Sequence, residues 1–123
     1  FAKALRHPGR AAWEYEYWRE MTKRRAALAD NLSPTLKANK PEGAFYAFIK
    51  VADASNEAFV VNMLMQGGIA VVPGSAFGAD FAGYVRLSFS TLKTDLIEVG
   101  ANRFNDIVTR INADKNFCEQ PLC

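Results

Sequence analysis

An arginine in the middle of a predicted strand is the side chain of this sequence whose type and position best suit ligand binding. In residues 84–90 (YVRLSFS), strand alternation places Val85, Leu87 and Phe89 on one face and Arg86 on the other. A guanidinium keeps its charge, and its planar set of N–H donors matches a carboxylate with two parallel hydrogen bonds. Arg86 therefore either pairs with a neighbouring acid, which the pattern alone favours, or receives the carboxylate of a small ligand.

The serines and glycines of the same region are weaker candidates. Ser75, Ser88 and Ser90 have no His or Asp partner at a spacing typical of nucleophilic catalysis. The glycine-rich residues 73–78 (PGSAFG) could form a phosphate-binding nest, but no Lys-Ser or Lys-Thr pair follows and no helix start adjoins them. We interpret this segment as a turn that directs the chain into the arginine strand.

Metal-binding and Schiff-base chemistry find no support in the residue pattern. The only histidine, His7, has no cysteine pair near it, so no zinc site of the usual spacing is predicted and His7 is expected on the surface. Lys50 is the only lysine in a predicted strand, and nothing marks it as a Schiff-base lysine. Cys118 and Cys123 lie near the end of the chain, so a disulfide between them would join only a tail.

Length, composition and charge indicate one folded domain. Half of the 123 residues are hydrophobic and about a quarter are charged, as in ordinary globular proteins. The net charge of +2 shows no basic stripe interleaved with aromatic residues, so nucleic-acid binding is not predicted. No apolar run approaches the ~18 residues of a membrane span, and we expect a cytoplasmic protein. Because the chain begins at Phe1, we also expect it to be part of a longer protein.

A long helix is predicted over residues 11–31. Its apolar residues recur at spacings of four and seven, the period of one helix face, and acidic residues precede the basic residues 23–25. The residue before Pro34 is pushed out of the helical region, so the helix ends there. The face that we expect to be buried consists of Trp13, Tyr17, Met21, Leu28 and Leu32.

Three short strands are predicted from aromatic and β-branched composition, over residues 45–51, 69–72 and 84–89. The first strand is apolar on both faces apart from Lys50, so we expect it to be largely covered. We accordingly interpret Phe45, Tyr46 and Phe48 as core residues rather than as the lining of a substrate entrance.

Two further helices complete the predicted domain. Asp53 or Ser55 would cap the first of them, which ends at Gly67-Gly68, and Thr91 or Thr94 would cap the second. The buried stripe of the second would consist of Leu96, Ile97, Phe104, Ile107, Val108 and Ile111. The order α-β-α-β-β-α predicts an α+β domain over residues 1–111, in which helices cover a small antiparallel or mixed sheet, followed by a tail over residues 112–123.

Three segments resemble consecutive landmarks of the C-terminal small domain of class I/II, fold-type I aminotransferases that depend on pyridoxal phosphate, and they are similar to the bacterial aspartate aminotransferase type. They are residues 40–48 (KPEGAFYAF), 68–78 (GIAVVPGSAFG) and 83–89 (GYVRLSF). The resemblance covers residues 13–111. Each motif alone would be weak, but the three in this order are specific. Leu92-Lys93 and the tail depart from the family pattern.

The resemblance implies that Arg86 holds the α-carboxylate of an amino-acid substrate, which reverses the preference that the pattern alone gave. It also implies that the Schiff-base lysine, the aspartate that pairs with the pyridine nitrogen and the phosphate cup lie in a large domain that precedes this region. We therefore expect no catalytic, cofactor-binding or metal-binding residue in this chain. Family members close the small domain over the substrate and build their sites at a subunit interface, so a homodimer is expected.

The implied function is part of a pyridoxal-phosphate enzyme that transfers an amino group between an amino acid and a 2-oxo acid. By itself this chain would carry an incomplete active site. The alternative is a free-standing, non-catalytic α+β module that uses Arg86 to bind a small carboxylate.

Overall fold

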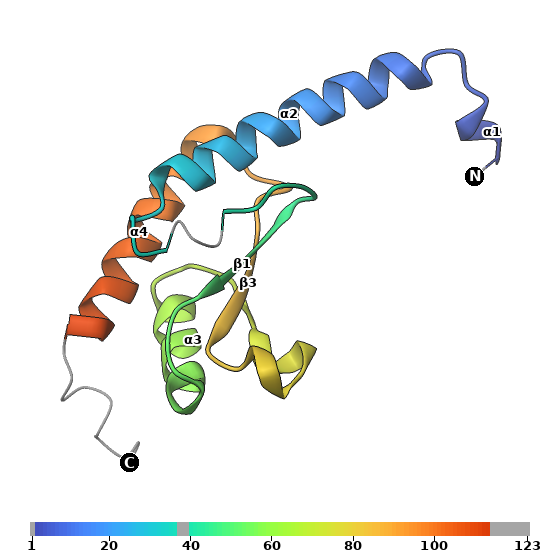
Figure 1. Ribbon diagram of the computed structural model, residues 1–123. Coiled ribbons are helices and arrows are strands. Elements are labelled where there is room, and N and C mark those ends of the chain that lie inside the picture. Colours follow the sequence, from blue (N-terminus) through green and yellow to red (C-terminus); the bar gives the residue numbers. More distant parts are fainter. Residues whose placement is uncertain (1, 37–39, 114–123) are drawn as a thin grey trace.

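The computed structural model describes residues 2–36 and 40–113 and shows helices packed against a small antiparallel sheet (Figure 1). The strands are β1 (Tyr46–Lys50), β2 (Val72–Pro73) and β3 (Tyr84–Ser88), in the order β1-β3-β2. Both strand pairs are antiparallel. The predicted α+β class is confirmed, and within the described residues the sheet contains no parallel pair.

The main helices follow the predicted order. They are α2 (Arg10–Asn31), α3 (Glu57–Gln66) and α4 (Thr94–Ala113), and a short α1 (Ala2–Leu5) precedes them. Three single 3-10 turns lie at Ala54–Asn56, Gly74–Phe77 and Ala79–Phe81. Helix α4 continues past the predicted domain boundary at residue 111. The rest of the predicted tail, with Cys118 and Cys123, lies outside the described residues.

The two faces of the sheet differ in what covers them. On β1, Ala47 and Ile49 are buried, whereas Tyr46 is exposed and Phe48 is partly exposed. On β3, Val85 is buried on the same inner face as Ile49, its register partner. The expectation that the first strand is largely covered is therefore confirmed for the face of Ala47 and Ile49 and wrong for the face of Tyr46 and Phe48. Helices cover the inner face, while the outer face carries aromatic side chains and the 3-10 turns that precede β3.

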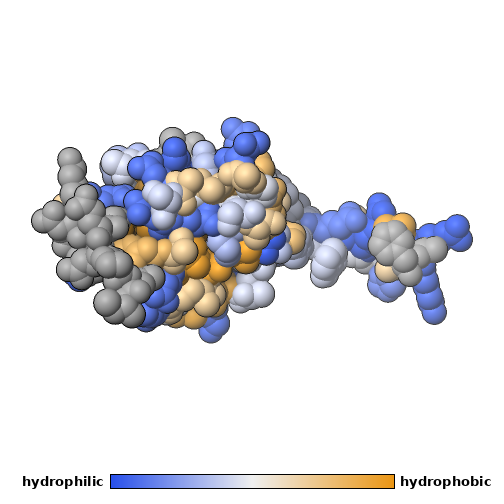
Figure 2. All heavy atoms as spheres, turned by 90° about the horizontal axis from the view of Figure 1, so that it is seen from below, coloured by the Kyte–Doolittle hydropathy of each residue, from blue (hydrophilic) through white to orange (hydrophobic). Residues whose placement is uncertain are grey.

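Helix α2 is confirmed, but the expected burial of its whole apolar stripe is wrong. Leu28 and Leu32 are 2% exposed, whereas Trp13 is 65% exposed and Tyr17 is 44% exposed. The reason is geometric: the N-terminal half of α2 extends beyond the sheet as an arm that stands out from the body of the molecule (Figures 1 and 2). The period of the stripe is that of a helix, but it does not report how far the helix remains in contact with the core.

Helix α4 packs against α2 and α3 and completes the core on the inner face of the sheet. Its buried residues are Ile97, Ala101, Phe104, Val108 and Ile111. Leu96 was also predicted in this stripe, but it is 51% exposed because it lies one residue, about 100°, away from Ile97 on the helix surface. Asn105 of α4 holds the end of α2: its side-chain amide donates to the Asn31 carbonyl at 2.7 Å and accepts from the Ser33 N–H at 2.9 Å.

Two local predictions between the strands are wrong. Neither Asp53 nor Ser55 caps α3 through its side chain, because the chain enters α3 through the 3-10 turn Ala54–Asn56. The predicted strand over residues 69–72 is paired only from Val72 onward. The Ile69 N–H donates instead to the Leu64 carbonyl at 2.9 Å, which uses this backbone group to end the helix rather than to start a strand.

Glu57, the first residue of α3, is the one buried charged side chain among the described residues, at 6% exposure. Its carboxylate accepts the Gly83 N–H at 2.6 Å and the Ser75 N–H at 3.3 Å, and it also accepts the Ser75 hydroxyl. Burying a carboxylate is costly unless donors replace its water. Here three donors do so, and they come from the two ends of the segment that joins β2 to β3.

These donors also decide the ionisation of Glu57. Burial by itself raises the pKa of the Glu57 carboxyl, but the hydrogen bonds from the Ser75 hydroxyl, the Gly83 N–H and the Ser75 N–H together lower it by more. The pKa of Glu57 therefore lies below its usual value, and the side chain is ionised at neutral pH.

Leu28→Ala should lower the free energy of unfolding by about 2–5 kcal/mol, because it removes a fully buried side chain from the contact of α2 with the core. Urea unfolding followed by circular dichroism measures the change. Leu96→Ala, at an exposed position on α4, is the matched control and should cost about 0.5 kcal/mol or less. Equal losses in the two variants would show that the burial of α2 is misassigned.

The lowered pKa of Glu57 predicts acid sensitivity of the fold. Because the unfolded chain protonates this carboxyl at a higher pH than the folded chain does, its contribution is present above the unfolded pKa of about 4.3 and is lost as pH falls through the folded pKa. Between about pH 6 and pH 3, wild type should lose stability more steeply than Glu57→Gln. Glu98→Gln, at an exposed acid of α4, should keep the wild-type slope. Identical slopes for wild type and Glu57→Gln would contradict the prediction.

Candidate functional site

Arg86 lies at the centre of the outer face of the sheet, as strand alternation predicted. It is in the middle of β3, opposite Phe48 of β1 and Val72 of β2. Val85 before it points into the core and is fully buried, whereas Arg86 is partly exposed. The guanidinium is therefore near the sheet surface, with a neighbouring strand on each side.

Two aromatic rings flank the guanidinium. The Arg86 Cζ atom lies 4.4 Å from the centre of the Tyr46 ring and 5.0 Å from the centre of the Phe77 ring. Both distances are typical of cation–π contacts, which stabilise a partly desolvated cation. Unlike an oxygen acceptor, the rings leave the N–H groups of the guanidinium free to bind a ligand. Within residues 2–36 and 40–113, Arg86 has no carboxylate at ion-pair distance and donates no hydrogen bond. The neighbouring acid that the pattern alone favoured is absent from this part of the chain.

An aromatic cluster, composed of Phe48, Phe77, Phe81 and Tyr84, extends the site along the sheet. The Phe48 ring stacks on Tyr84 at 5.2 Å between centroids and meets Phe77 and Phe81 edge to face at 5.8 Å and 5.4 Å. Phe77 is 43% exposed and Phe81 is 44% exposed. A ligand that reached Arg86 would thus lie on an apolar surface that excludes water from one side of the guanidinium.

This arrangement can bind an anion. The five N–H donors of Arg86 have no acceptor among the described residues, and the rings beside them hold the side chain in place. A carboxylate can accept two of these donors in parallel, and a partly desolvated pair of this kind is stronger than one in open water. The site offers recognition and orientation, and no acid, base or nucleophile lies in contact with the guanidinium.

The other candidates from the sequence do not join this site. Ser88 and Ser90 share a hydrogen bond with each other at 3.0 Å, and Ser75 is bound to Glu57. His7 is exposed and accepts the N–H of Gly9. In the part of the chain that the structure describes, no three His, Cys, Asp or Glu side chains are grouped to hold a metal ion. None of the described helices has the length and apolar composition that a membrane span requires.

The basic cluster at residues 23–25 has a structural role in two of its members. Arg24 pairs with Glu20 at 2.9 Å and donates to the Ser90 carbonyl, which ties α2 to the chain just after β3. Arg25 donates to the Glu42 carbonyl at 2.8 Å. These contacts join α2 to the chain before the start of β1 and after the end of β3, and neither arginine lies beside the aromatic cluster.

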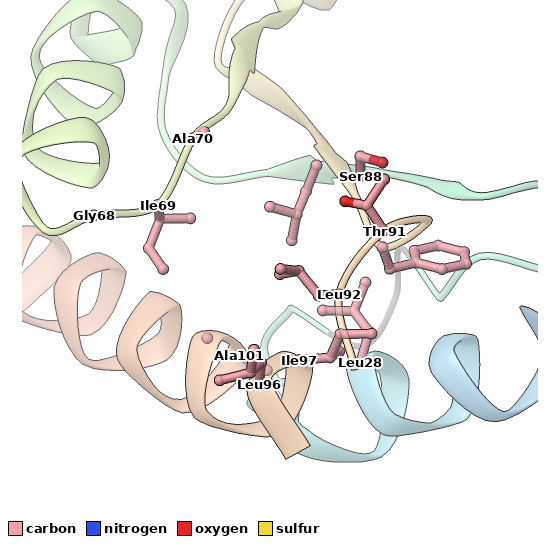
Figure 3. A pocket seen from close by; sticks show the side chains of 13 residues that line it. Leu28, Gly68, Ile69, Ala70, Ser88, Thr91, Leu92, Leu96, Ile97 and Ala101 are labelled. Carbon is pink, nitrogen blue, oxygen red and sulfur yellow. The ribbon is translucent and has the colours of Figure 1, made fainter. Parts of the chain in front are cut away.

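A separate cavity lies on the opposite side of β3 (Figure 3). Its volume is about 390 Å³, and it opens where residues 69–70 diverge from the strand instead of pairing with it. Leu87, on the face opposite Arg86, is part of the wall, and the lining is apolar apart from the hydroxyls of Ser88 and Thr91. The residues that line this cavity thus include no titratable side chain.

Sequence reasoning missed three residues that form or support the site, and it interpreted one of them, Tyr46, as a core residue. Phe77 was included only in the segment interpreted as a turn, and its contact with Arg86 depends on how that turn folds back over β3. Glu57 has the appearance of an ordinary acid in the first turn of a helix, where a negative charge suits the dipole. Its burial could have been suspected only from the apolar residues that follow it.

Residues 1–104 match the sequence profile of the aminotransferase class I and II family. The aspartate aminotransferase of Pyrococcus abyssi is 40% identical over 100 residues, which cover 79% of this chain and 26% of that protein. The aromatic-amino-acid aminotransferase 2 of Thermococcus litoralis is 39% identical over 102 residues, with the same coverage of 79% and 26%.

A solved structure agrees with these sequence matches. The aromatic aminotransferase from Pyrococcus horikoshii OT3 superposes with a TM-score of 0.74 at 32% identity, over 90% of this chain and 30% of that chain. The chain thus spans about a quarter of the length of the curated relatives it matches. The fold, the sequence motifs around Arg86 and the family match agree, and the chain belongs to the class I and II aminotransferase family.

Proposed function

We propose that this chain is the substrate-carboxylate-binding part of a pyridoxal-phosphate-dependent aminotransferase that converts an amino acid and a 2-oxo acid. The observation that carries the proposal is the state of Arg86: a partly buried guanidinium, held between Tyr46 and Phe77, with no acid partner in the described residues. A cation that is positioned but not neutralised suits an anionic ligand that comes and goes. Both substrates of such an enzyme carry a carboxylate beside the reacting carbon.

The described residues do not fit the cofactor itself. The glycine turn at residues 73–78 would be the natural place for a phosphate, but the N–H and hydroxyl of Ser75 already bind the Glu57 carboxylate. A phosphate there would meet a buried negative charge. Pyridoxal phosphate, which the family implies, would therefore be held by other parts of a longer protein, as the coverage of about a quarter of the relatives' length also suggests.

Arg86 would act by orientation. Two parallel hydrogen bonds to a carboxylate fix both its distance and its plane, which limits how the rest of the substrate can rotate. Tyr46 and Phe77 would prevent the guanidinium from turning away, and the aromatic cluster would keep water from competing for its donors. We further propose that the whole protein is a cytoplasmic homodimer in which this domain closes over the substrate.

The absorption spectrum of the full-length gene product, purified with pyridoxal phosphate, tests the enzyme proposal. A visible band from the bound cofactor is expected, and at least one of the twenty standard L-amino acids should bleach it by converting the cofactor to its amine form. If the protein binds no pyridoxal phosphate, the enzyme proposal fails. The alternative of a non-catalytic carboxylate-binding module would then be tested by adding small carboxylates to the protein and measuring their binding.

Arg86→Lys in the full-length protein tests the role of the guanidinium. A point charge replaces a two-pronged donor, and losing one charge-assisted hydrogen bond of about 1.5–3 kcal/mol predicts a fall in kcat/KM of roughly 10- to 100-fold. Arg110→Lys, at an exposed arginine in the last turn of α4, should leave kcat/KM unchanged. Unchanged kinetics in Arg86→Lys would remove the carboxylate role while leaving the cofactor band intact.

A further inference from the structure

The segment between β2 and β3 decides how the Arg86 site is built. It runs from Gly74 to Gly83, contains two 3-10 turns and carries Phe77, one of the two rings on the guanidinium. Its internal backbone bonds are short-range: the Gly78 N–H donates to Ser75, the Phe81 N–H to Gly78 and the Ala82 N–H to Ala79. Such bonds shape each turn but do not attach the segment to the rest of the domain.

We propose that Glu57 is a positioning residue for the carboxylate site. Its carboxylate accepts hydrogen bonds from both ends of this segment, at Ser75 and at Gly83, and thereby holds Phe77 and β3 in place around Arg86. The inference rests on the proposed function of Arg86. Glu57 touches neither the guanidinium nor, by the geometry, any ligand on the outer face of the sheet. It acts through the backbone of Ser75 at one end and of Gly83 at the other.

At the first end of the segment, Glu57 anchors the turn that carries Phe77. Ser75 gives both its hydroxyl and its N–H to the carboxylate, and Phe77 follows two residues later in the same 3-10 turn. The Phe77 ring is 43% exposed, and within the described residues it contacts the Arg86 guanidinium and meets the Phe48 ring edge to face. Its position over the guanidinium therefore depends on the turn, which is anchored through Ser75.

At the second end of the segment, Glu57 binds the backbone of Gly83, the residue before β3. Gly83 donates its N–H to Glu57, while its carbonyl accepts the N–H groups of Val51 at 2.9 Å and Ala52 at 3.2 Å. Its φ of +88° and the lack of space for a Cβ, which would lie 2.3 Å from the Ala52 carbonyl oxygen, require glycine here. Because side chains alternate along a strand, fixing Gly83 fixes which face Arg86 occupies three residues later.

The segment is also closely packed at its beginning. A Cβ on Gly74 would lie 2.1 Å from the Phe81 carbonyl oxygen, so the two turns press against each other at this point. The Glu57 carboxylate accepts donors from both ends of the segment, and within the described residues only the Gly83 carbonyl and the ring contacts with Phe48 join the segment to the first strand. Replacing that carboxylate should loosen the aromatic wall of the site before it unfolds the domain.

The test compares Glu57→Gln with a variant that is equally destabilised elsewhere, both in the full-length protein. Gln keeps the shape of Glu, but its amide nitrogen cannot accept a hydrogen bond, so at least one donor of Ser75 or Gly83 is lost. Val108→Ala, in the core of α4, removes stability without touching the segment. For the amino acid that bleaches the cofactor band, we expect KM to rise about 5- to 20-fold in Glu57→Gln and to stay within twofold of wild type in Val108→Ala.

A double-mutant cycle separates this inference from the proposed function. If Glu57 acts through Arg86, the combined Glu57→Gln and Arg86→Lys variant should be clearly less impaired than the product of the two single effects. Two outcomes would overturn the positioning role and leave the proposed function standing. In the first, Arg86→Lys impairs kinetics but the effects of the two substitutions on kinetics are additive. In the second, the KM of Glu57→Gln equals that of Val108→Ala. An Arg86→Lys variant with wild-type kinetics would overturn both the positioning role and the proposed function.

Ser75→Ala provides the second variant, in case Glu57→Gln does not fold. It removes one donor and keeps the carboxylate with the two N–H groups of Ser75 and Gly83. We expect a rise in KM smaller than that of Glu57→Gln, about 2- to 5-fold, with the cofactor band unchanged. A value of KM equal to wild type in Ser75→Ala would count against the inference.

Discussion

The buried carboxylate of Glu57 is the constraint around which the functional side of this domain is arranged. A carboxylate at 6% exposure is tolerated only because three donors replace its water, and all three come from residues that bracket the segment before β3. Satisfying the charge therefore closes that segment on the start of α3. The same closure sets the starting point of β3, brings Phe77 over the sheet and leaves the donors of Ser75 unavailable to a phosphate.

Because helices cover only one face of the sheet, the domain has two different surfaces. The inner face is apolar and is held by α2, α3 and α4, with Asn105 and Arg24 joining α2 to the elements on either side of it. The outer face keeps Arg86 and a set of half-exposed aromatic side chains. An exposed apolar patch of this kind is characteristic of ligand-binding or interaction surfaces. It agrees with the proposed role of Arg86 in ligand binding.

Much of the fold and the position of the central cation were predictable from the sequence. The long helix, the order of the elements and the outward direction of Arg86 all depend on local periodicity, which is a property of neighbouring residues. The length of the buried part of α2 and of the second strand was less predictable. Trp13 and Tyr17 share the helical period of Leu28 yet are exposed, since the period does not say where the core ends. Residues 69–71 have strand composition, but the N–H of Ile69 is used to end α3.

By itself, the sequence determined the class of the fold and the resemblance to one enzyme family, and it predicted Arg86 as a candidate carboxylate-binding residue. Only the tertiary structure decided that Arg86 has aromatic neighbours and no acid partner within the described residues, and that Glu57 is buried against Ser75 and Gly83. The physical reason is distance along the chain. Tyr46 and Arg86, or Glu57 and Gly83, are separated by many residues, and no local pattern records which of them meet. Those contacts arise from strand pairing and from the need to satisfy a buried charge, and both are properties of the folded molecule.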